Sequence, residues 1–203
     1  RMRRNILRGT TVAVSPAQVE RAAAMLAAAQ LPLIHAGSGV IHAGAFAALQ
    51  RVAEVLHAPV CTSWAARGAF PEQHELAVPM IYVDLNDRVR NEADVVLALG
   101  TRFGETDWWG KAPNWAQPPK QTLIQVDVDE DILGMNKPAE MTVMGDAGLF
   151  LEALYVALEK HKTNLSLDTR REAVADYQKE KSAQRAKLDK VLEDRSAPMV
   201  TGH

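Results

Sequence analysis

The stretch Asp94-Val-Val-Leu-Ala-Leu-Gly100 decides the fold. Five apolar residues follow one another without a polar interruption, and a glycine ends the run. A strand that is apolar at every position, and not only at alternate ones, is buried on both faces, which is typical of a parallel sheet. The stretch therefore predicts a parallel β-strand that ends at Gly100.

Similar apolar stretches alternate with segments of helical periodicity along the first 160 residues. The further predicted strands are 32–36, 59–63, 121–126 and 141–144. The predicted helices are 17–30, after an N-cap signal at Ser15-Pro16, then 43–57, 86–92 and 147–160. Helices between parallel strands supply the crossovers, on both sides of the sheet. The order predicts an α/β fold: a doubly wound, mainly parallel sheet of five or six strands with helices on both faces, Rossmann-like in the manner of DHS-like nucleotide-binding domains.

The chain divides into three parts by composition. We expect an N-terminal linker over residues 1–14, a domain over 15–160 and a densely charged tail over 161–203. The tail holds a predicted helix over 168–195, which ends before a break at residues 196–198. Its thin apolar stripe favours a solvated surface helix, with a partner-binding or oligomerisation arm as the alternative.

Length, charge and cysteine content exclude several classes of protein. In 203 residues, 23 Lys and Arg stand against 25 Asp and Glu, which gives a formal charge of −2 and argues against a nucleic-acid partner. No apolar run reaches the roughly 18 residues that a membrane helix requires, so we expect no membrane partner. Cys61 is the single cysteine, which excludes an intrachain disulfide and fits a reducing, cytoplasmic location.

Candidate ligand-binding residues lie at the ends of the predicted strands, because an open parallel sheet binds ligands at its carboxyl edge. Gly37, Ser38 and Gly39 follow the strand 32–36. Glycines allow a backbone to approach a phosphate closely, and the N-terminus of a following helix favours an anion. The next glycine is Gly44, a spacing that departs from the dinucleotide fingerprint. A phosphate cradle and a plain tight turn therefore stay open as alternatives.

Two further strand ends carry polar candidates. Gly100, Thr101 and Arg102 follow one strand, and the arginine either clamps a pyrophosphate or carboxylate or lies on the surface after a turn. Asp127 and Asp129 follow another; one of them could accept a hydrogen bond from a ribose or an adenine, and the other could cap the segment after it.

Other conspicuous residues suggest no reaction centre. Trp108, Trp109 and Trp115 lie in a proline-rich loop, where tryptophans more often pack or contact another domain than stack on a base. We expect Cys61 to be buried and inert. The histidines lack the spacing of metal ligands. The sequence accordingly predicts neither catalytic residues nor a metal site in this chain.

Six segments together resemble the central domain of thiamine-diphosphate-dependent enzymes, the acetolactate synthase and benzoylformate decarboxylase group. They occur in the family's order and at its distances, at residues 32–40, 58–62, 67–74, 92–103, 124–129 and 145–147. The resemblance implies a parent enzyme that decarboxylates or ligates a 2-keto acid through thiamine diphosphate. It also implies Mg²⁺, an N-terminal domain with an activating glutamate, a C-terminal domain with a Gly-Asp-Gly motif, and a homo-oligomer. Neither the glutamate-bearing domain nor the motif is present here, so we expect this chain alone to be inactive and its tail to lead to the missing C-terminal domain.

The family's central domains hold FAD, hold ADP or serve as a structural wedge. By this resemblance, Gly37, Ser38, Gly39, Gly100, Thr101, Arg102 and Asp127 would line the cleft. The sequence departs from flavin-binding members at residues 104–106, which usually hold two aspartates and an arginine, and at 77–82, which replaces a glycine-rich segment. Both departures argue against FAD. A free-standing nucleotide- or FAD-binding module stays open as the alternative function.

Overall fold

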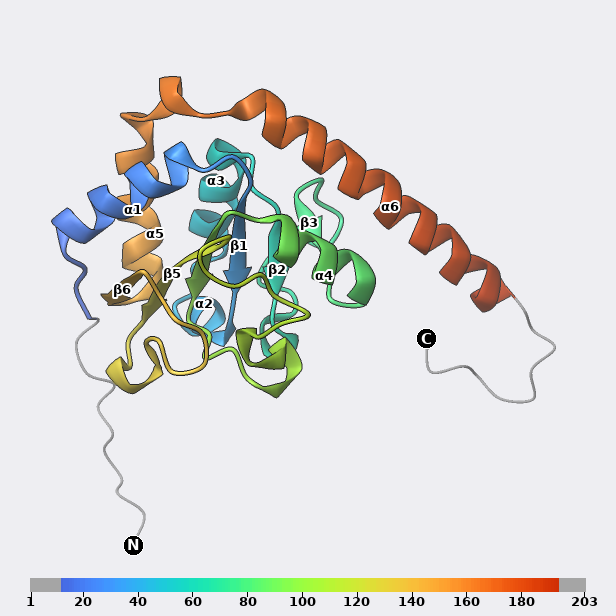
Figure 1. Cartoon of the computed structure of the whole chain (residues 1–203), viewed down its shortest axis with the longest axis horizontal. Helices are drawn as coiled ribbons and strands as arrows, with labels where there is room; N and C mark the ends of the chain where they lie inside the picture. The colour runs from blue at the N-terminus through green and yellow to red at the C-terminus, as the bar shows by residue number, and fades with distance from the viewer. Residues whose placement is uncertain (1–11, 194–203) are drawn as a thin grey trace, which may run out of the picture.

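The computed structural model describes residues 12–193, and in them one parallel sheet organises the chain (Figure 1). Its six strands lie in the order β3-β2-β1-β4-β5-β6, and every neighbouring pair is parallel. The strands are β1 (Pro32–Ala36), β2 (Val60–Thr62), β3 (Ala77–Val78), β4 (Val95–Leu99), β5 (Thr122–Asp127) and β6 (Met141–Met144). The predicted doubly wound parallel fold is confirmed. The two-residue strand β3 was not predicted, since Ala77 and Val78 are too short a run to show a period.

The α-helices of the described chain are α1 (Pro16–Ala28), α2 (Ser38–His42), α3 (Phe46–Leu56), α4 (Val83–Glu92), α5 (Ala147–Glu159) and α6 (Leu167–Glu193). The predicted helix over 43–57 begins three residues late. The glycine turn after β1 instead forms a helix of its own, α2, and Gly44 at φ +63° separates α2 from α3. Such a φ interrupts a helix and suits glycine.

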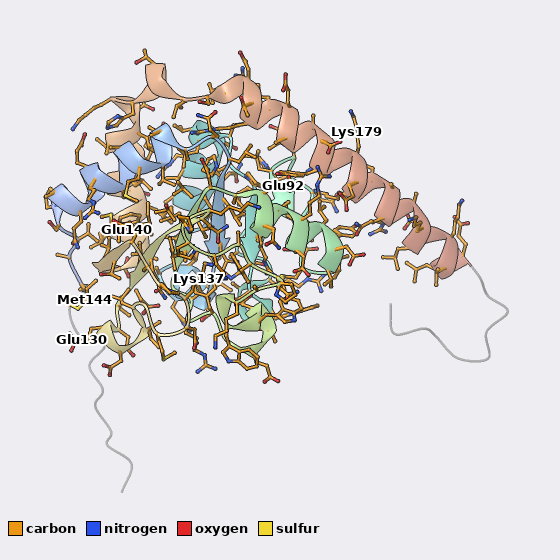
Figure 2. All side chains as sticks on the ribbon, viewed as in Figure 1. Glu92, Glu130, Lys137, Glu140, Met144 and Lys179 are labelled. Carbon is orange, nitrogen blue, oxygen red and sulfur yellow. The ribbon has the colours of Figure 1, made fainter. Side chains whose placement is uncertain are left out.

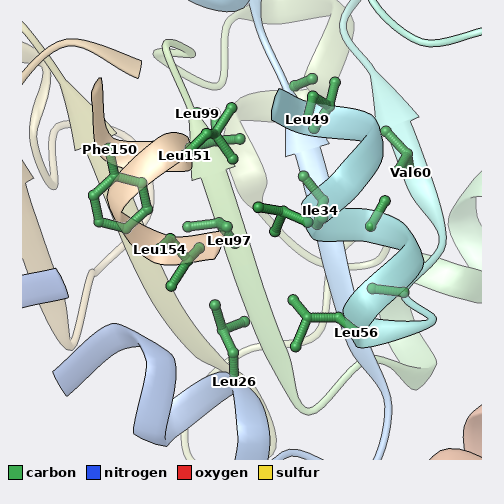
Figure 3. Close-up of a cluster of buried hydrophobic side chains, with 14 of the residues drawn as sticks. Leu26, Ile34, Leu49, Leu56, Val60, Leu97, Leu99, Phe150, Leu151 and Leu154 are labelled. Atoms are coloured by element: carbon green, nitrogen blue, oxygen red, sulfur yellow. The ribbon is translucent and has the colours of Figure 1, made fainter. Parts of the chain in front are cut away.

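Two apolar cores lie on opposite faces of the sheet. On one face, α1, α3 and α5 pack against β1 and β4 through residues that include Leu26, Leu49 and Leu154 (Figure 3). On the other face, α4 and the segment between β4 and β5 cover the alternate strand residues. Every residue of β1 and β4 is buried, as the continuous apolar run of β4 predicts, and the buried residues of β1 include His35.

The crossover from β4 to β5, residues 100–121, contains no α-helix, and Trp115 fills the place beside the sheet that a helix would take. A buried irregular backbone needs partners for its polar groups. Side chains supply them: Lys137 Nζ donates to the carbonyls of Ala116 at 2.6 Å and Gly110 at 3.3 Å, and Trp115 Nε1 donates to the carbonyl of Asp107 at 2.9 Å. The expectation that tryptophans of this loop pack is confirmed for Trp115.

Helix α6 is bound to the domain more tightly than a solvated surface helix. Its residues Val174 and Tyr177 are buried, and so is Arg170. The Arg170 guanidinium donates to the carbonyl oxygens of Leu56, Leu26, Ala27 and Ala29, at 2.6–3.1 Å. These carbonyls end α3 and α1 and have no acceptor role inside their own helices. The prediction of a solvated helix is therefore wrong for the first half of α6, because the charge pattern hid a cap made by a buried arginine.

Contacts reach slightly beyond the expected domain at both ends. The carbonyl of Val12 accepts from the amide of Asp146 at 2.9 Å, and α6 follows residue 160. The division at residues 14 and 160 stays a prediction. Residues 1–11 of the expected linker and the predicted break at 196–198 lie outside the described residues. Among the helices of residues 12–193, none is long and apolar enough to cross a membrane.

Replacing Arg170 with alanine should destabilise the domain strongly, because the ends of α1 and α3 lose their shared donor. We expect the free energy of unfolding to fall by about 3 kcal/mol, given that buried hydrogen bonds from a charged group are lost. Urea denaturation measures this change. The control is Arg171→Ala, since Arg171 is exposed and pairs only with Asp168; equal losses in both variants would contradict the capping role of Arg170.

Candidate binding cleft at the carboxyl edge of the sheet

The strand order reverses between β1 and β4, which lie side by side although β2 and β3 come between them in sequence. In open parallel sheets, ligands bind outside the carboxyl ends of the strands at such a point. The structure places Gly37, Ser38 and Gly39 after β1, Gly100, Thr101 and Arg102 after β4, and Asp127 at the end of β5. The predicted site residues thus share one edge of the sheet.

The two glycine segments are in direct backbone contact. A Cβ atom on Gly37 would lie 2.2 Å from the carbonyl oxygen of Gly100, and one on Gly100 would lie 2.4 Å from the Cα of Gly39. Real Cβ atoms do not approach other atoms so closely. Gly100 also has φ +57°, in the left-handed region that favours glycine. Glycine at these three positions is therefore required by the meeting of β1 and β4.

This contact engages two backbone amides of the glycine segment. The amide of Gly37 donates to the carbonyl of Leu99 at 2.8 Å, and the amide of Gly39 donates to the carbonyl of Gly100 at 3.1 Å. Each of these amides is committed to the neighbouring strand segment. The geometry favours the tight-turn interpretation of the glycine segment over a phosphate cradle, while the half-buried Ser38 lies between the two engaged amides.

Thr101 and Arg102 differ in what they offer to a ligand. Thr101 is buried, and its hydroxyl oxygen accepts from the amide of Phe103 at 3.2 Å. Arg102 has an exposed side chain, while its carbonyl oxygen accepts from Asn136 at 2.8 Å. The exposed guanidinium of Arg102 is accordingly accessible to solvent, while Thr101 is not.

Asp127 and Asp129 take separate roles, as the sequence alternatives allowed. Asp129 accepts from the amide of Asp131 at 3.1 Å and so caps the short turn after it. The half-buried Asp127 accepts from the amide of Asp129 at 3.1 Å. Burial raises the pKa of Asp127, against the lowering effect of its backbone hydrogen bonds. The role of Asp127 toward a ligand stays a prediction.

A buried charged cluster behind this edge was not predicted. His35 of β1 lies with Nε2 3.3 Å from Oδ1 of Asp107, and Arg90 of α4 lies with Nη2 3.5 Å from the same oxygen. All three side chains are buried. The Arg90 guanidinium lies 4.7 Å from the centre of the Trp115 ring, and the His35 ring stacks on Phe103 at 5.4 Å. The cluster ties β1 and α4 to the β4–β5 crossover.

Opposed effects act on the charge of Asp107. Burial alone would raise its pKa, but the nearby His35 and Arg90 outweigh burial, and the pKa of Asp107 is lowered. The Lys137 ammonium lies 5.6 Å from the centre of the Trp115 ring and has no carboxylate among its hydrogen-bond partners, so burial lowers its pKa to about 8. The Cys61 thiol is buried, which raises its pKa to about 12 and confirms the expected burial of this residue.

The comparisons with known proteins agree with this geometry. Residues 19–154 match the family described as thiamine pyrophosphate enzyme, central domain. The chain belongs to this family, and the resemblance inferred from the six sequence segments is confirmed.

Individual relatives are enzymes of the same group. A probable acetolactate synthase large subunit of Methanocaldococcus jannaschii is 36% identical over 146 residues, which are 70% of this chain and 24% of that protein. A sulfoacetaldehyde acetyltransferase of Roseovarius nubinhibens is 32% identical over 194 residues, 90% of this chain and 30% of that protein. The solved benzoylformate decarboxylase of Polynucleobacter necessarius shares the fold, with a TM-score of 0.60 at 23% identity, over 78% of this chain and 29% of that one. The chain thus spans less than a third of these relatives.

The close approach of β1 and β4 predicts a large difference between two glycine substitutions. Gly100→Ala and Gly44→Ala each place alanine at a positive φ, but a Cβ on Gly44 has no atom within 4 Å. Both lose about 1 kcal/mol to the left-handed backbone. We expect a further loss of at least about 3 kcal/mol in Gly100→Ala from steric overlap. Urea denaturation of the two variants measures the difference, and equal stabilities would contradict the close contact.

The lowered pKa of Asp107 predicts how stability depends on pH. An aspartate whose pKa falls on folding stabilises the protein above its unfolded pKa of about 3.9, and that stabilisation is lost as the pH falls through the lower folded pKa. Asp107→Asn leaves Arg90 without its buried partner and should cost about 3 kcal/mol at pH 7. The difference from the wild type should shrink below about pH 4.

Chemical denaturation at several pH values measures this dependence. The exposed Asp131→Asn variant is the control and should match the wild type within about 0.5 kcal/mol. A difference between Asp107→Asn and wild type that stays constant down to pH 2 would show that the charge of Asp107 does not stabilise the fold.

Proposed function

We propose that this chain is the central part of a longer thiamine-diphosphate-dependent enzyme that acts on a 2-keto acid, and that it serves there to space and orient the cofactor-binding domains. The carrying observation is the contact between the two glycine segments, in which the amides of Gly37 and Gly39 donate to the backbone of Leu99 and Gly100. The match to the central domain of the family, over less than a third of its relatives' length, supports the same role. The relatives' names indicate acyl transfer or decarboxylation as the chemistry of the whole enzyme.

The sites for thiamine diphosphate and Mg²⁺ would then lie in the other domains. Within residues 12–193, no three His, Cys, Asp or Glu side chains are grouped so that they could hold a metal ion. Asp146 of the Gly145-Asp146-Ala147 segment accepts from the amides of Gly148 and Leu149 at 2.9 and 3.0 Å. Its carboxylate caps α5, so this segment does not fit a magnesium ligand. We derive no catalytic step in this chain.

A nucleotide-binding module is the second candidate function, and the exposed Arg102 with Asp127 on the next strand favours it. ADP would require fewer contacts than FAD. One of the two segments that depart from flavin-binding members is built into the domain here, because Ala77 and Val78 pair with β2 while Met80 and Tyr82 are buried. The pairing and burial of this segment argue against FAD as a ligand more strongly than against ADP.

The cell location and assembly follow from the same proposal. The reduced, buried Cys61 fits a cytoplasmic enzyme. A homo-oligomer is proposed for the whole enzyme from its family.

A pair of measurements on the purified 203-residue chain tests the proposal. With thiamine diphosphate and Mg²⁺ present, the chain should not turn over pyruvate or benzoylformate, because the residues that activate the cofactor are elsewhere. Turnover by this chain would contradict the proposed role.

Thermal unfolding with ADP, FAD, NAD and coenzyme A separates the two candidates. A ligand at one hundred times its dissociation constant stabilises a protein by about 2.7 kcal/mol, so binding would raise the unfolding temperature by several degrees. The orienting role predicts no rise with any of them. A rise that is abolished in Arg102→Ala and retained in the control Arg171→Ala would establish the nucleotide-binding module instead.

A further inference from the structure

Exposed apolar side chains gather at one edge of the sheet. Of the thirteen large hydrophobic side chains that are exposed among residues 12–193, nine lie in the segments that follow the carboxyl ends of the strands, and a tenth, Met144, is the last residue of β6. These ten are Ile41, Phe46, Trp64, Ile81, Val83, Trp109, Val128, Met135, Met144 and Leu149. Single exposed apolar residues are ordinary, but such a concentration marks an interaction site. We call these ten residues the carboxyl-edge surface.

Every strand contributes to this surface. Trp64 follows β2 in the turn η1 (Trp64–Ala66), which contacts α2, and Trp109 lies in the β4–β5 crossover. Met144 ends β6, and Leu149 lies in the first turn of α5. Figure 2 shows Met144 with Glu130 on the side of the domain toward which the strand arrows point. The surface therefore extends across the whole edge and exceeds what one small ligand would cover.

The opposite edge of the sheet is already covered. Helix α6 crosses the amino ends of the strands (Figure 1), where Ala173 and Tyr177 lie beside Pro32 and Pro59. Lys181 of the same helix donates to the carbonyl of Ala77, at the start of β3, at 3.1 Å. Helix α6 thus covers the amino edge of the sheet, whereas no helix of the described residues covers the carboxyl edge in this way.

The backbone holds a tryptophan outward at the carboxyl edge. Trp108 and Trp109 adopt φ +49° and +51°, which bulky side chains rarely do. Arg90 and Asp107 brace this corner from inside, with the Arg90 guanidinium 5.6 Å from the centre of the Trp108 ring. Trp109 is nevertheless 45% exposed. Strained backbone that presents an aromatic side chain to solvent points to a contact function, and tryptophan is enriched at the centres of protein interfaces.

We propose that the carboxyl-edge surface is the docking face for the domains that the relatives carry beyond the length of this chain. This inference rests on the proposed function, since it identifies where the orienting contact is made. The length of the relatives outside the matched part and the apolar character of the surface together identify what binds there. About 70% or more of each relative lies outside the matched part, and the surface is apolar across all six strand ends. Asp127 and Asp129 flank Val128, and Arg102 is exposed at the same edge, so the opposing protein surface should carry basic groups opposite the aspartates and an acidic group opposite Arg102.

Hydroxyl-radical footprinting tests the proposal, because four of the ten residues are tryptophan or methionine, the side chains that oxidise readily. The oxidation rates of Trp64, Trp109, Met135 and Met144 are compared in this 203-residue chain and in the complete polypeptide expressed from the same locus. Burial at an interface should slow them by about fivefold or more in the complete polypeptide. Met25 of α1 is partly exposed and lies outside the surface, so its rate serves as the control and should not change.

Matched variants of the complete polypeptide make the test specific. Leu149→Glu should restore rapid oxidation of Trp64 and Met144, whereas Val156→Glu, at an exposed position of α5 outside the surface, should leave them protected. Rates that are equal in the short and complete polypeptides would overturn the proposal. Protection that appears in the short chain on raising its concentration would assign the surface to a second copy, and protection by added ADP would assign it to a ligand; either result also overturns it. The footprint is independent of turnover, so a complete polypeptide that is inactive toward 2-keto acids would refute the proposed function without deciding the docking face.

Discussion

The contact between the backbones of Gly39 and Gly100 is the constraint on which the structure depends. It brings the carboxyl ends of β1 and β4 together at the point where the strand order reverses. The residues that follow both strands are thereby fixed, including the amides of Gly37 and Gly39, which donate to the backbone of Leu99 and Gly100. The same contact therefore joins the two strand ends and leaves two amides fewer for a phosphate.

A second constraint comes from the crossover between β4 and β5, which has a short 3-10 helix over residues 105–110 but no α-helix. Without an α-helix, much of its backbone needs other hydrogen-bond partners, and side chains such as Lys137 and Trp115 supply some of them. Asp107 compensates the charge of Arg90 where both are buried. The buried cluster of His35, Arg90 and Asp107 stabilises this irregular segment. The same crossover contains residues with positive φ, and it presents Trp109 to solvent.

The sequence predicted the long strands because β4 is apolar at every position, β1 at most of its positions and β5 at half of them. The strand 94–99 and the helix 147–160 match β4 and α5 within one residue. The candidate site residues were also correctly predicted to share one edge, because the carboxyl ends of parallel strands meet at the same edge of a sheet. The sequence could not predict the cluster of His35, Arg90 and Asp107, since three residues far apart in sequence have no spacing that reports their contact. The cap made by Arg170 was hidden for the same reason, because in sequence it is one charge among many in the tail.

Amide hydrogen exchange at Gly37 and Gly39, followed by NMR with and without ADP, tests the central claim most directly. If both amides are committed to the backbone beyond β4, they should exchange as slowly as the amides of β1 itself, and their rates and chemical shifts should not respond to ADP. Rapid exchange at either glycine, or a shift of either resonance on adding ADP, would show that these amides are available to a ligand and would contradict the account.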